Sequence, residues 1–413
     1  MKSFRSIIQY LRLWGFNGLW HLIKLKIFNW KMERYFLGNA KKYPLTPKCG
    51  ITIIADLTLQ TSLSKVMRDL IIALNNADIP YQTFDLRPKN FIDMPLFKDL
   101  LTPEKDFRTL KYNHIIEMFS TPFPKSLKMK RARIVFWEFS TGLLEHDPEI
   151  GNVDTVIAMS DFNKTVFQEM LPQTVNVKKI LYPFFFEKNT IPDKLTIRSK
   201  FKIPNNAFTV LYNFDYRSSF NRKNPDGAIQ AFTMAFADVQ DTYLIFKTNG
   251  LIEHQEYRDK LIRLAQKLGI SDRLIMIDDF ISQNDIYGLT NACDIYLSLH
   301  RGEGFGLGIV EAMSLGKPVI ATDYSSTTEF CKAHTSIPIP YTLVDIPSEM
   351  RDHPTYNAVK KWAEPDINAA SKGLIKLYKD AELRENLGNA AKQFVSEYFS
   401  RNNFKSSIEA FLK

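Results

Sequence analysis

Residues 295–321, IYLSLHRGEGFGLGIVEAMSLGKPVIA, decide the fold of this chain. The apolar run 295–299 predicts a buried strand, and a glycine-rich turn connects it to a helical stretch that ends before Gly316. A second short strand, Pro318–Ala321, follows directly. A strand that leads through a helix into another strand predicts a parallel sheet with crossover helices.

The same alternation continues on both sides of these residues. Before a break, strands are predicted at 51–57, 81–86, 114–119, 134–139, 155–159 and 178–182, with helices at 62–75 and 162–170. After the break, strands at 208–214, 243–247, 274–277 and 294–299 alternate with helices at 226–236, 253–268, 283–292 and 306–315, and helices at 366–379 and 381–398 follow. Pro183–Asp193 has no helix signal and is interpreted as a linker. Two such series predict an α/β chain of two Rossmann-like domains, whose ligands bind at the carboxyl ends of the strands.

The net charge of +9 is concentrated near the N-terminus. Residues 1–42 carry nine Lys or Arg and one acid, Glu33. Their longest uncharged run, Leu13–Ile23, is shorter than the ~20 residues that a membrane-spanning helix needs. The apolar positions fit two amphipathic helices, which either bind an anionic membrane or pack against the globular body.

The three cysteines, Cys49, Cys293 and Cys331, are widely spaced and show no metal-binding pattern. We interpret them as buried thiols in a reducing, cytoplasmic compartment.

The glycine-rich turn has the composition of a phosphate-binding segment. Gly304 and Gly306 let backbone N–H groups approach a ligand, and the following helix N-terminus favours an anion. Two carboxylates, Glu303 in the turn and Glu311 in the helix, are suited to sugar and ribose hydroxyls. By itself, the turn favours a purely structural strand–turn–helix over a binding site.

Residues 298–321 resemble the donor motif of the retaining GT-B glycosyltransferases of family four (glycosyl transferases group 1). The spacing of Glu303 and Glu311 matches the Glu-x7-Glu pair of that family. Further segments that look typical of it, particularly of bacterial members that build polysaccharides, are 213–232, 244–250, 278–300 and 362–370. The resemblance implies a GT-B architecture, two Rossmann-like domains facing across a cleft, with an N-terminal amphipathic helical extension. The expected parts are the extension at 1–42, an acceptor domain at 43–188, a donor-binding domain at 189–395 and a helix at 396–413 that could cross back to the acceptor domain.

The resemblance also implies roles for particular residues. Glu303, Lys223 and Glu138, which lies in the Trp-Glu segment 135–139, are the candidate catalytic residues. The expected donor-binding residues are Arg222, Lys223, Lys247, His300, Arg301, Gly304, Phe305, Gly306, Leu307 and Glu311. The expected acceptor-binding residues are Ser62, Ser64, Arg68, Trp137 and Glu138. Glu138 is equally consistent with a salt-bridged residue at a strand end.

Three departures from the family pattern stand out. The arginine that often follows the first strand of the donor domain is replaced by Phe214-Asp215, with Arg217 nearby. Thr58–Lys65 has no glycine, and neither does the loop 323–329 that follows the donor helix.

The implied activity is transfer of a hexose from a UDP-, GDP- or dTDP-sugar, with retention of anomeric configuration, to a glycan, lipid-linked or protein-linked acceptor in cell-surface polysaccharide or glycoconjugate synthesis. No cofactor or metal is expected, because Asp278 and Asp279 are adjacent and do not form a spaced metal motif. We expect no nucleic-acid partner. The protein is expected to be cytoplasmic, and residues 1–42 could attach it peripherally to the inner face of the membrane. Homo-oligomer formation is left open. The alternative is a non-catalytic partner subunit with the same fold: the missing glycines favour it, whereas Lys223 and the Glu303/Glu311 pair argue against it.

Overall fold

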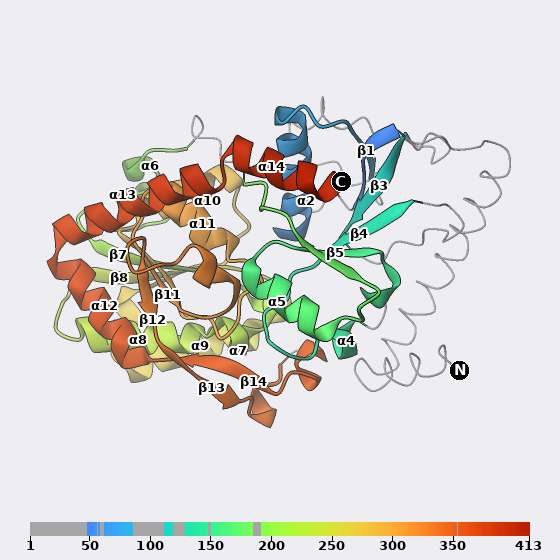
Figure 1. The fold of residues 1–413 in the computed structure, drawn as a ribbon. Helices are drawn as coiled ribbons and strands as arrows, with labels where there is room; N and C mark the ends of the chain where they lie inside the picture. The colour runs from blue at the N-terminus through green and yellow to red at the C-terminus, as the bar shows by residue number, and fades with distance from the viewer. Residues whose placement is uncertain are drawn as a thin grey trace. The chain divides into compact units, whose positions relative to one another are not determined.

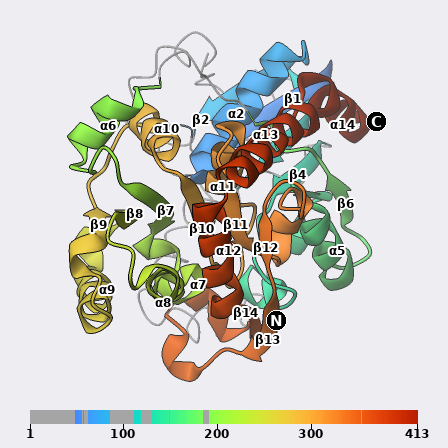
Figure 2. The ribbon, with the colours of Figure 1, turned by 90° about the vertical axis from the view of Figure 1, so that its left-hand side faces the viewer.

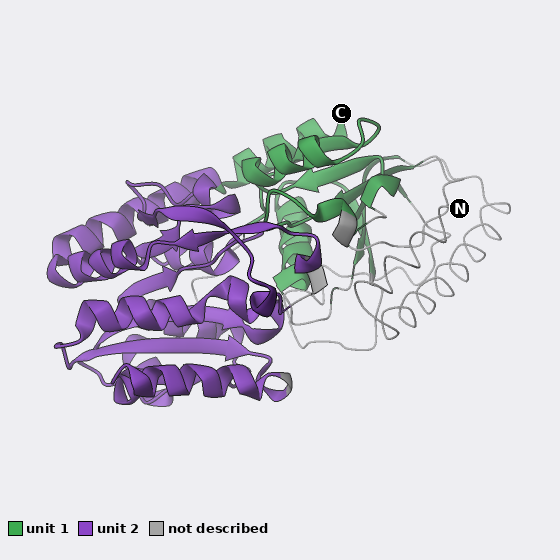
Figure 3. Cartoon of the chain, turned by 90° about the horizontal axis from the view of Figure 1, so that it is seen from below, with its two compact units in different colours: residues 1–185, 399–413 green, residues 186–398 purple. Residues whose placement is uncertain are grey.

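The computed structural model describes residues 48–55, 57, 62–85, 111–118, 129–147, 150–184, 191–352 and 354–413. The extension predicted for residues 1–42 lies outside these ranges. The chain divides into two compact units: unit 1 is Met1–Phe185 with Phe399–Lys413, and unit 2 is Phe186–Tyr398 (Figure 3). Among the described residues, no helix has both the length and the apolar character required to cross a membrane.

Unit 2 is built on a six-stranded parallel sheet. Its strands are β7 (Phe208–Asp215), β8 (Thr242–Asn249), β9 (Leu274–Ile277), β10 (Ile295–Ser298), β11 (Val319–Thr322) and β12 (Ile337–Ile339), in the order β12-β11-β10-β7-β8-β9. The first strand, β7, and the fourth, β10, are neighbours at the centre. Because the chain winds outward in both directions from this pair, their carboxyl ends form the topological switch point at which ligands bind in such sheets.

Helices cover both faces of this sheet (Figures 1 and 2). One face carries α8 (Pro225–Phe236), α9 (Gln255–Lys267) and α12 (Ile367–Lys379), and the other carries α6 (Lys194–Lys200), α10 (Gln283–Ala292) and α11 (Leu307–Ser314), with α13 (Ala381–Tyr398) packed on α11. Local sequence sets the helix starts: Asp193, Asn224 and Ser282 each accept a backbone N–H in the first turn. An aromatic core that includes Tyr212 and Phe232 lies beneath α8.

A two-stranded antiparallel hairpin is attached to unit 2, formed by β13 (Tyr341–Asp345) and β14 (Lys361–Pro365) (Figure 1). The sequence pattern did not predict this hairpin. Shorter turns in unit 2 are α7 (Phe220–Lys223) and the 3-10 segments η4 (Tyr216–Ser218), η5 (Leu251–Glu253), η6 (Ser271–Arg273), η7 (Ser325–Glu329), η8 (Ser348–Met350) and η9 (Pro354–Asn357).

Unit 1 contains a second six-stranded parallel sheet, in the order β2-β1-β3-β4-β5-β6. Its strands are β1 (Lys48–Ala55), β2 (Tyr81–Asp85), β3 (Tyr112–Glu117), β4 (Lys130–Ile134), β5 (Thr155–Ala158) and β6 (Asn176–Lys179). Within its described residues, the helices are α2 (Ser62–Asn76), α4 (Leu143–His146), α5 (Asp161–Met170) and α14 (Arg401–Leu412), with the 3-10 turn η2 (Ile150–Asn152). Helix α14 packs on α2, and the carbonyl oxygen of Phe411 accepts a hydrogen bond from Lys178 Nζ at 3.1 Å.

The expectation of two Rossmann-like α/β domains is confirmed, but two details were wrong. The strand predicted at 134–139 lies at Lys130–Ile134, so Glu138 follows the strand and does not end it. Charges hid this strand in the sequence: Arg133 is buried and donates to the buried carboxylate of Glu117 at 2.9 and 3.0 Å. Cys49 is exposed because it lies at the uncovered start of β1, whereas Cys293 and Cys331 are buried as expected.

Candidate functional site

A polar cluster lies at the switch point of unit 2. Strand β7 leads through η4 into α7, which ends at Lys223, while β10 leads into the turn that contains His300 and Glu303. Since β7 and β10 are paired and parallel, the two connections emerge at the same edge of the sheet. The topology therefore brings together residues that are 80 positions apart in the sequence.

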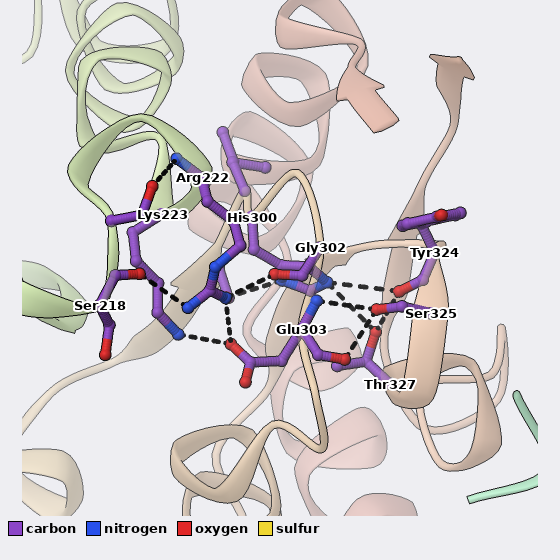
Figure 4. A network of polar contacts seen from close by, with 12 residues as sticks. Ser218, Arg222, Lys223, His300, Gly302, Glu303, Tyr324, Ser325 and Thr327 are labelled. Carbon is purple, nitrogen blue, oxygen red and sulfur yellow. Dashed lines mark hydrogen bonds and ion pairs between the residues drawn. The ribbon is translucent and has the colours of Figure 1, made fainter. Parts of the chain in front are cut away.

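The centre of the cluster is an ion pair between Lys223 and Glu303 (Figure 4). Lys223 Nζ lies 2.6 Å from Glu303 Oε2, and each side chain is less than one-fifth exposed, at 18% and 17%. Burial alone would raise the pKa of Glu303, but the nearby charges of Lys223 and Arg222 lower it to about 2. Glu303 is therefore a carboxylate, an acceptor of hydrogen bonds, across the physiological pH range.

Arg222 supplies the second cation of this cluster. Its Nη1 donates to the carbonyl oxygen of Gly302 at 2.7 Å and lies 3.9 Å from Glu303 Oε2 (Figure 4). Its Nη2 donates to Ser218 O at 2.8 Å. The guanidinium is thus held against the turn that carries Glu303, and two positive groups approach one carboxylate.

His300 and Ser325 hold the turn from the opposite side. His300 is fully buried, with Nδ1 3.1 Å from Ser298 Oγ and Nε2 3.4 Å from Tyr324 O. Burial lowers the pKa of His300 to about 4, so that the ring is neutral near pH 7. The Ser325 hydroxyl accepts from the Glu303 N–H and donates to the Glu303 carbonyl oxygen, both at 2.9 Å (Figure 4).

The glycine-rich turn ends at Gly306, the residue that precedes α11. Gly306 has a φ of 94°, and a Cβ there would lie 2.8 Å from Thr327 Cγ2, so that both backbone and space require glycine. Leu307 opens the helix, and its first N–H groups have no acceptor within the helix. Gly304 is buried in the turn, and Phe305 packs on Phe330 with ring centroids 5.7 Å apart.

Glu311 lies on the buried side of α11, and its hydrogen-bond partners differ from those of the Lys223–Glu303 ion pair. Its Oε1 is 3.4 Å from both Tyr287 Oη and Gln283 Nε2 of α10. The two carboxylates of the Glu-x7-Glu pair thus have different partners.

Three other basic residues have contacts outside this cluster. Arg301 pairs through both Nε and Nη2 with Glu364 of β14, at 2.6 and 2.8 Å, and lies 4.7 Å above the Trp362 ring. Lys247 is buried in β8, where its ammonium donates to Thr248 O and to Asn249 Oδ1; burial lowers the pKa of Lys247 to about 8. Arg217, half-exposed, pairs with Asp215 at 2.8 Å.

In unit 1, the predicted acceptor residues lie on two elements. Ser62 is exposed at the start of α2, Ser64 is buried, and Arg68 donates to Leu57 O at 2.9 Å. Beyond β4, the buried Asn163 side chain donates to Trp137 O at 2.6 Å and accepts from Trp137 N at 3.3 Å, which fixes the segment that contains the half-buried Glu138.

A cavity of about 420 Å³ lies near the ends of β8 and β9. It is lined by Leu251, Gln255, Arg258, Asp259, Met276, Asp278 and Asp279, none of which the sequence analysis singled out as a binding residue. Within the described ranges, no cluster of three His, Cys, Asp or Glu side chains is arranged to hold a metal ion.

The sequence matches a known family over part of its length. Residues 193–337, which contain the whole polar cluster, match the model of the family described as "Glycosyl transferases group 1". The chain is 27% identical over 154 residues to the serotype-specific mannosyltransferase WbdA of Escherichia coli, covering 37% of this chain but only 18% of WbdA. It is 24% identical over 375 residues to the alpha-1,3/1,6-mannosyltransferase ALG2 of Dictyostelium discoideum, covering 84% of this chain and 80% of that relative.

Solved structures match the fold over most of the chain. The Anabaena protein Alr3699/HepE, in complex with UDP and glucose, superposes with a TM-score of 0.62 at 18% identity, over 88% of this chain and 99% of that one. WaaG, a glycosyltransferase involved in lipopolysaccharide biosynthesis, gives a TM-score of 0.55 at 14% identity, over 87% and 98%. The chain therefore has the two-domain α/β fold of the GT-B glycosyltransferases.

Proposed function

We propose that this protein is a glycosyltransferase that moves a sugar from a nucleotide-sugar donor to a glycan, lipid-linked or protein-linked acceptor in polysaccharide or glycoconjugate synthesis. The observation that carries the proposal is the Lys223–Glu303 ion pair, with Arg222 beside it, at the switch point of the unit 2 sheet. The family match over residues 193–337 and the names of the relatives support it.

The chemistry follows from the charges of the cluster. When a sugar nucleotide reacts, the nucleoside diphosphate is the leaving group. Negative charge therefore grows on its phosphate oxygens as the bond to the sugar breaks. Lys223, which has three donors and uses one on Glu303, and Arg222 stabilise that charge together with the N-terminus of α11. Glu303 accepts hydrogen bonds from sugar hydroxyls, and Glu311 is assigned to the ribose. Neutral His300 helps to fix the start of the turn that carries Glu303.

We also propose that transfer proceeds with retention and without a metal. Two cations beside the diphosphate neutralise the leaving group by themselves, and the same leaving phosphate takes the acceptor proton, so no protein nucleophile is assigned. The configuration of the product, read by NMR, tests retention, and turnover that survives a chelator tests metal independence. Acceptor binding is assigned to unit 1, at Ser62, Ser64, Arg68, Trp137 and Glu138, and peripheral membrane attachment to residues 1–42.

The proposed site is tested with Lys223→Met and Glu303→Gln. A thermal-shift screen against UDP-, GDP- and dTDP-sugars first identifies the donor, because a ligand that binds only the folded state raises the melting temperature. With that donor, we expect each variant to lose about a hundredfold or more in transfer rate, the usual loss when a group that stabilises transition-state charge is removed.

Matched controls are Lys267→Met and Glu385→Gln, which change exposed helix residues that are not part of the cluster. Both should retain wild-type rates. Wild-type activity in Lys223→Met and Glu303→Gln would refute the site, and donor binding without turnover on any acceptor would point to the non-catalytic subunit.

A further inference from the structure

The segment between β13 and β14, residues 346–360, makes a set of polar contacts with α7 that the proposed chemistry has not used. The two segments are more than 120 residues apart in the sequence, yet four hydrogen bonds join them. We propose that Asp352 and Tyr356 are positioning residues, which hold α7 so that Arg222 and Lys223 face the donor diphosphate. The inference rests on the function proposed above.

Helix α7 needs outside support because of its own geometry. It has only four residues, too few to be stable by itself. It is bracketed by Ser219, with a φ of 65°, and Asn224, with a φ of 54°. In this left-handed region, the backbone of a residue with a side chain is less stable by roughly 1–2 kcal/mol than in an ordinary conformation. Contacts from elsewhere must therefore hold the turn.

Asp352 supplies the first support, at the start of α7. Its Oδ1 accepts from the Ser219 hydroxyl at 2.6 Å, and its Oδ2 accepts from the Asn221 N–H at 2.9 Å. The Asn221 side chain donates in turn to Met350 O at 3.1 Å. One carboxylate thus satisfies two donors at the end of a helix where acceptors favour helix formation.

Tyr356 supplies the second support, directly on a proposed diphosphate-binding residue. It is 3% exposed, and its hydroxyl accepts from Arg222 Nε at 3.0 Å. With Nη1 on Gly302 O and Nη2 on Ser218 O, the guanidinium of Arg222 is held on three sides. The Arg222 head group therefore has one orientation, toward the turn that carries Glu303.

Hydrogen bonds also join the described residues of the 346–360 segment to one another. Arg351 donates through Nη1 to the carbonyl oxygens of Tyr356 and Val359, and Ile346 N donates to Lys360 O at 3.0 Å. Strand β14 is anchored to the glycine-rich turn, because Glu364 pairs with Arg301 and Arg301 Nη1 donates to Asn221 O. The hairpin thus connects both loops of the cluster.

Tyr356→Phe tests the proposal, because it removes one hydroxyl and leaves the ring. Calorimetric titrations with UDP, GDP and dTDP, and with the matching monophosphates UMP, GMP and dTMP, separate the phosphate contribution from the rest of the nucleotide. We expect nucleoside-diphosphate affinity to fall about tenfold, since Arg222 Nε loses a buried acceptor, while monophosphate affinity changes less than twofold. Asp352→Asn should act in the same direction. Tyr398→Phe, which loses a hydroxyl bonded to Glu329, is the control and should keep both affinities.

Hydrogen exchange of the ligand-free protein gives a second, independent measure. Peptides that cover Ser219–Asn224 should exchange faster in Tyr356→Phe and Asp352→Asn than in the wild type. Equal losses of diphosphate and monophosphate affinity, or unchanged exchange, would overturn the inference. A wild type that binds none of the six nucleotides would contradict the proposed function instead, and exchange alone would then decide whether Asp352 and Tyr356 hold α7.

Discussion

At the scale of single residues, Ser325 shows what the fold adds to the site. Its φ is 65°, in the region that normally favours glycine, yet the loop 323–329 contains no glycine. The reason for serine is its hydroxyl, which bonds both the N–H and the carbonyl of Glu303. Strain at this position is offset by two hydrogen bonds to the central carboxylate residue.

Replacing Ser325 should therefore reverse the usual order of alanine and glycine. Both variants lose the hydroxyl, but Ser325→Ala keeps a Cβ at the strained φ, whereas Ser325→Gly has no Cβ and relieves the strain. We expect Ser325→Gly to be more stable than Ser325→Ala by roughly 1 kcal/mol in urea denaturation. At Ser371, inside α12, the order should be the ordinary one, with alanine more stable. Alanine more stable than glycine at both positions would contradict this account.

At the scale of elements, a pair of glycines sets how closely α13 approaches the end of α11. Gly388 of α13 faces the backbone of Gly316, and a Cβ on Gly388 would lie 2.1 Å from Gly316 O. Backbone atoms on both sides leave no flexible group to move. Helix α11, which follows the donor turn, is therefore held in place by contact with a helix near the end of the chain.

Gly388→Ala should destabilise the protein even though alanine is the better helix former. Overpacking of this kind costs about 1–3 kcal/mol, more than the ~1 kcal/mol that alanine contributes inside a helix. Chemical denaturation measures the difference. Gly373→Ala in α12 is the comparison, because its Cβ would meet the Ile337 side chain at 3.3 Å, which can adjust. Equal stability of the two variants would argue against close backbone contact.

At the scale of the whole molecule, the chain returns to unit 1 at its end. Helix α14 buries Phe404, Ile408 and Phe411 on unit 1, and Leu181 N donates to Ser407 Oγ at 3.2 Å. Residues at the C-terminus therefore stabilise the unit that contains the N-terminal half of the chain.

Ile408→Ala should lower the stability of unit 1 selectively. The side chain is fully buried, so truncation should cost about 2–5 kcal/mol. Hydrogen exchange should accelerate in β1 and in the other strands of unit 1, while β7, β8 and the remaining strands of unit 2 keep wild-type rates. Glu409→Ala, at an exposed neighbour, should change neither unit. Acceleration confined to unit 2 would be incompatible with the role of α14.

Sequence by itself determined the two Rossmann-like series and the segments that form the polar cluster. Strand and helix periodicity, the glycines before α11 and the order of Lys223 and Glu303 are local features, because backbone conformation and turn geometry depend on neighbouring residues. The same local signals failed at β4, where the buried Arg133 pairs with Glu117, and at β13–β14, where the fifteen residues 346–360 separate the two strands.

Only the tertiary structure decided which side chains meet. The parallel pairing of β7 and β10 placed Lys223 against Glu303, and the hairpin placed Asp352 and Tyr356 against α7. It also directed Arg301 to Glu364 and buried Lys247 within β8, although both are basic residues in motif positions. The physical reason is that hydrogen bonds and ion pairs between distant residues depend on strand order and packing, which no local pattern encodes.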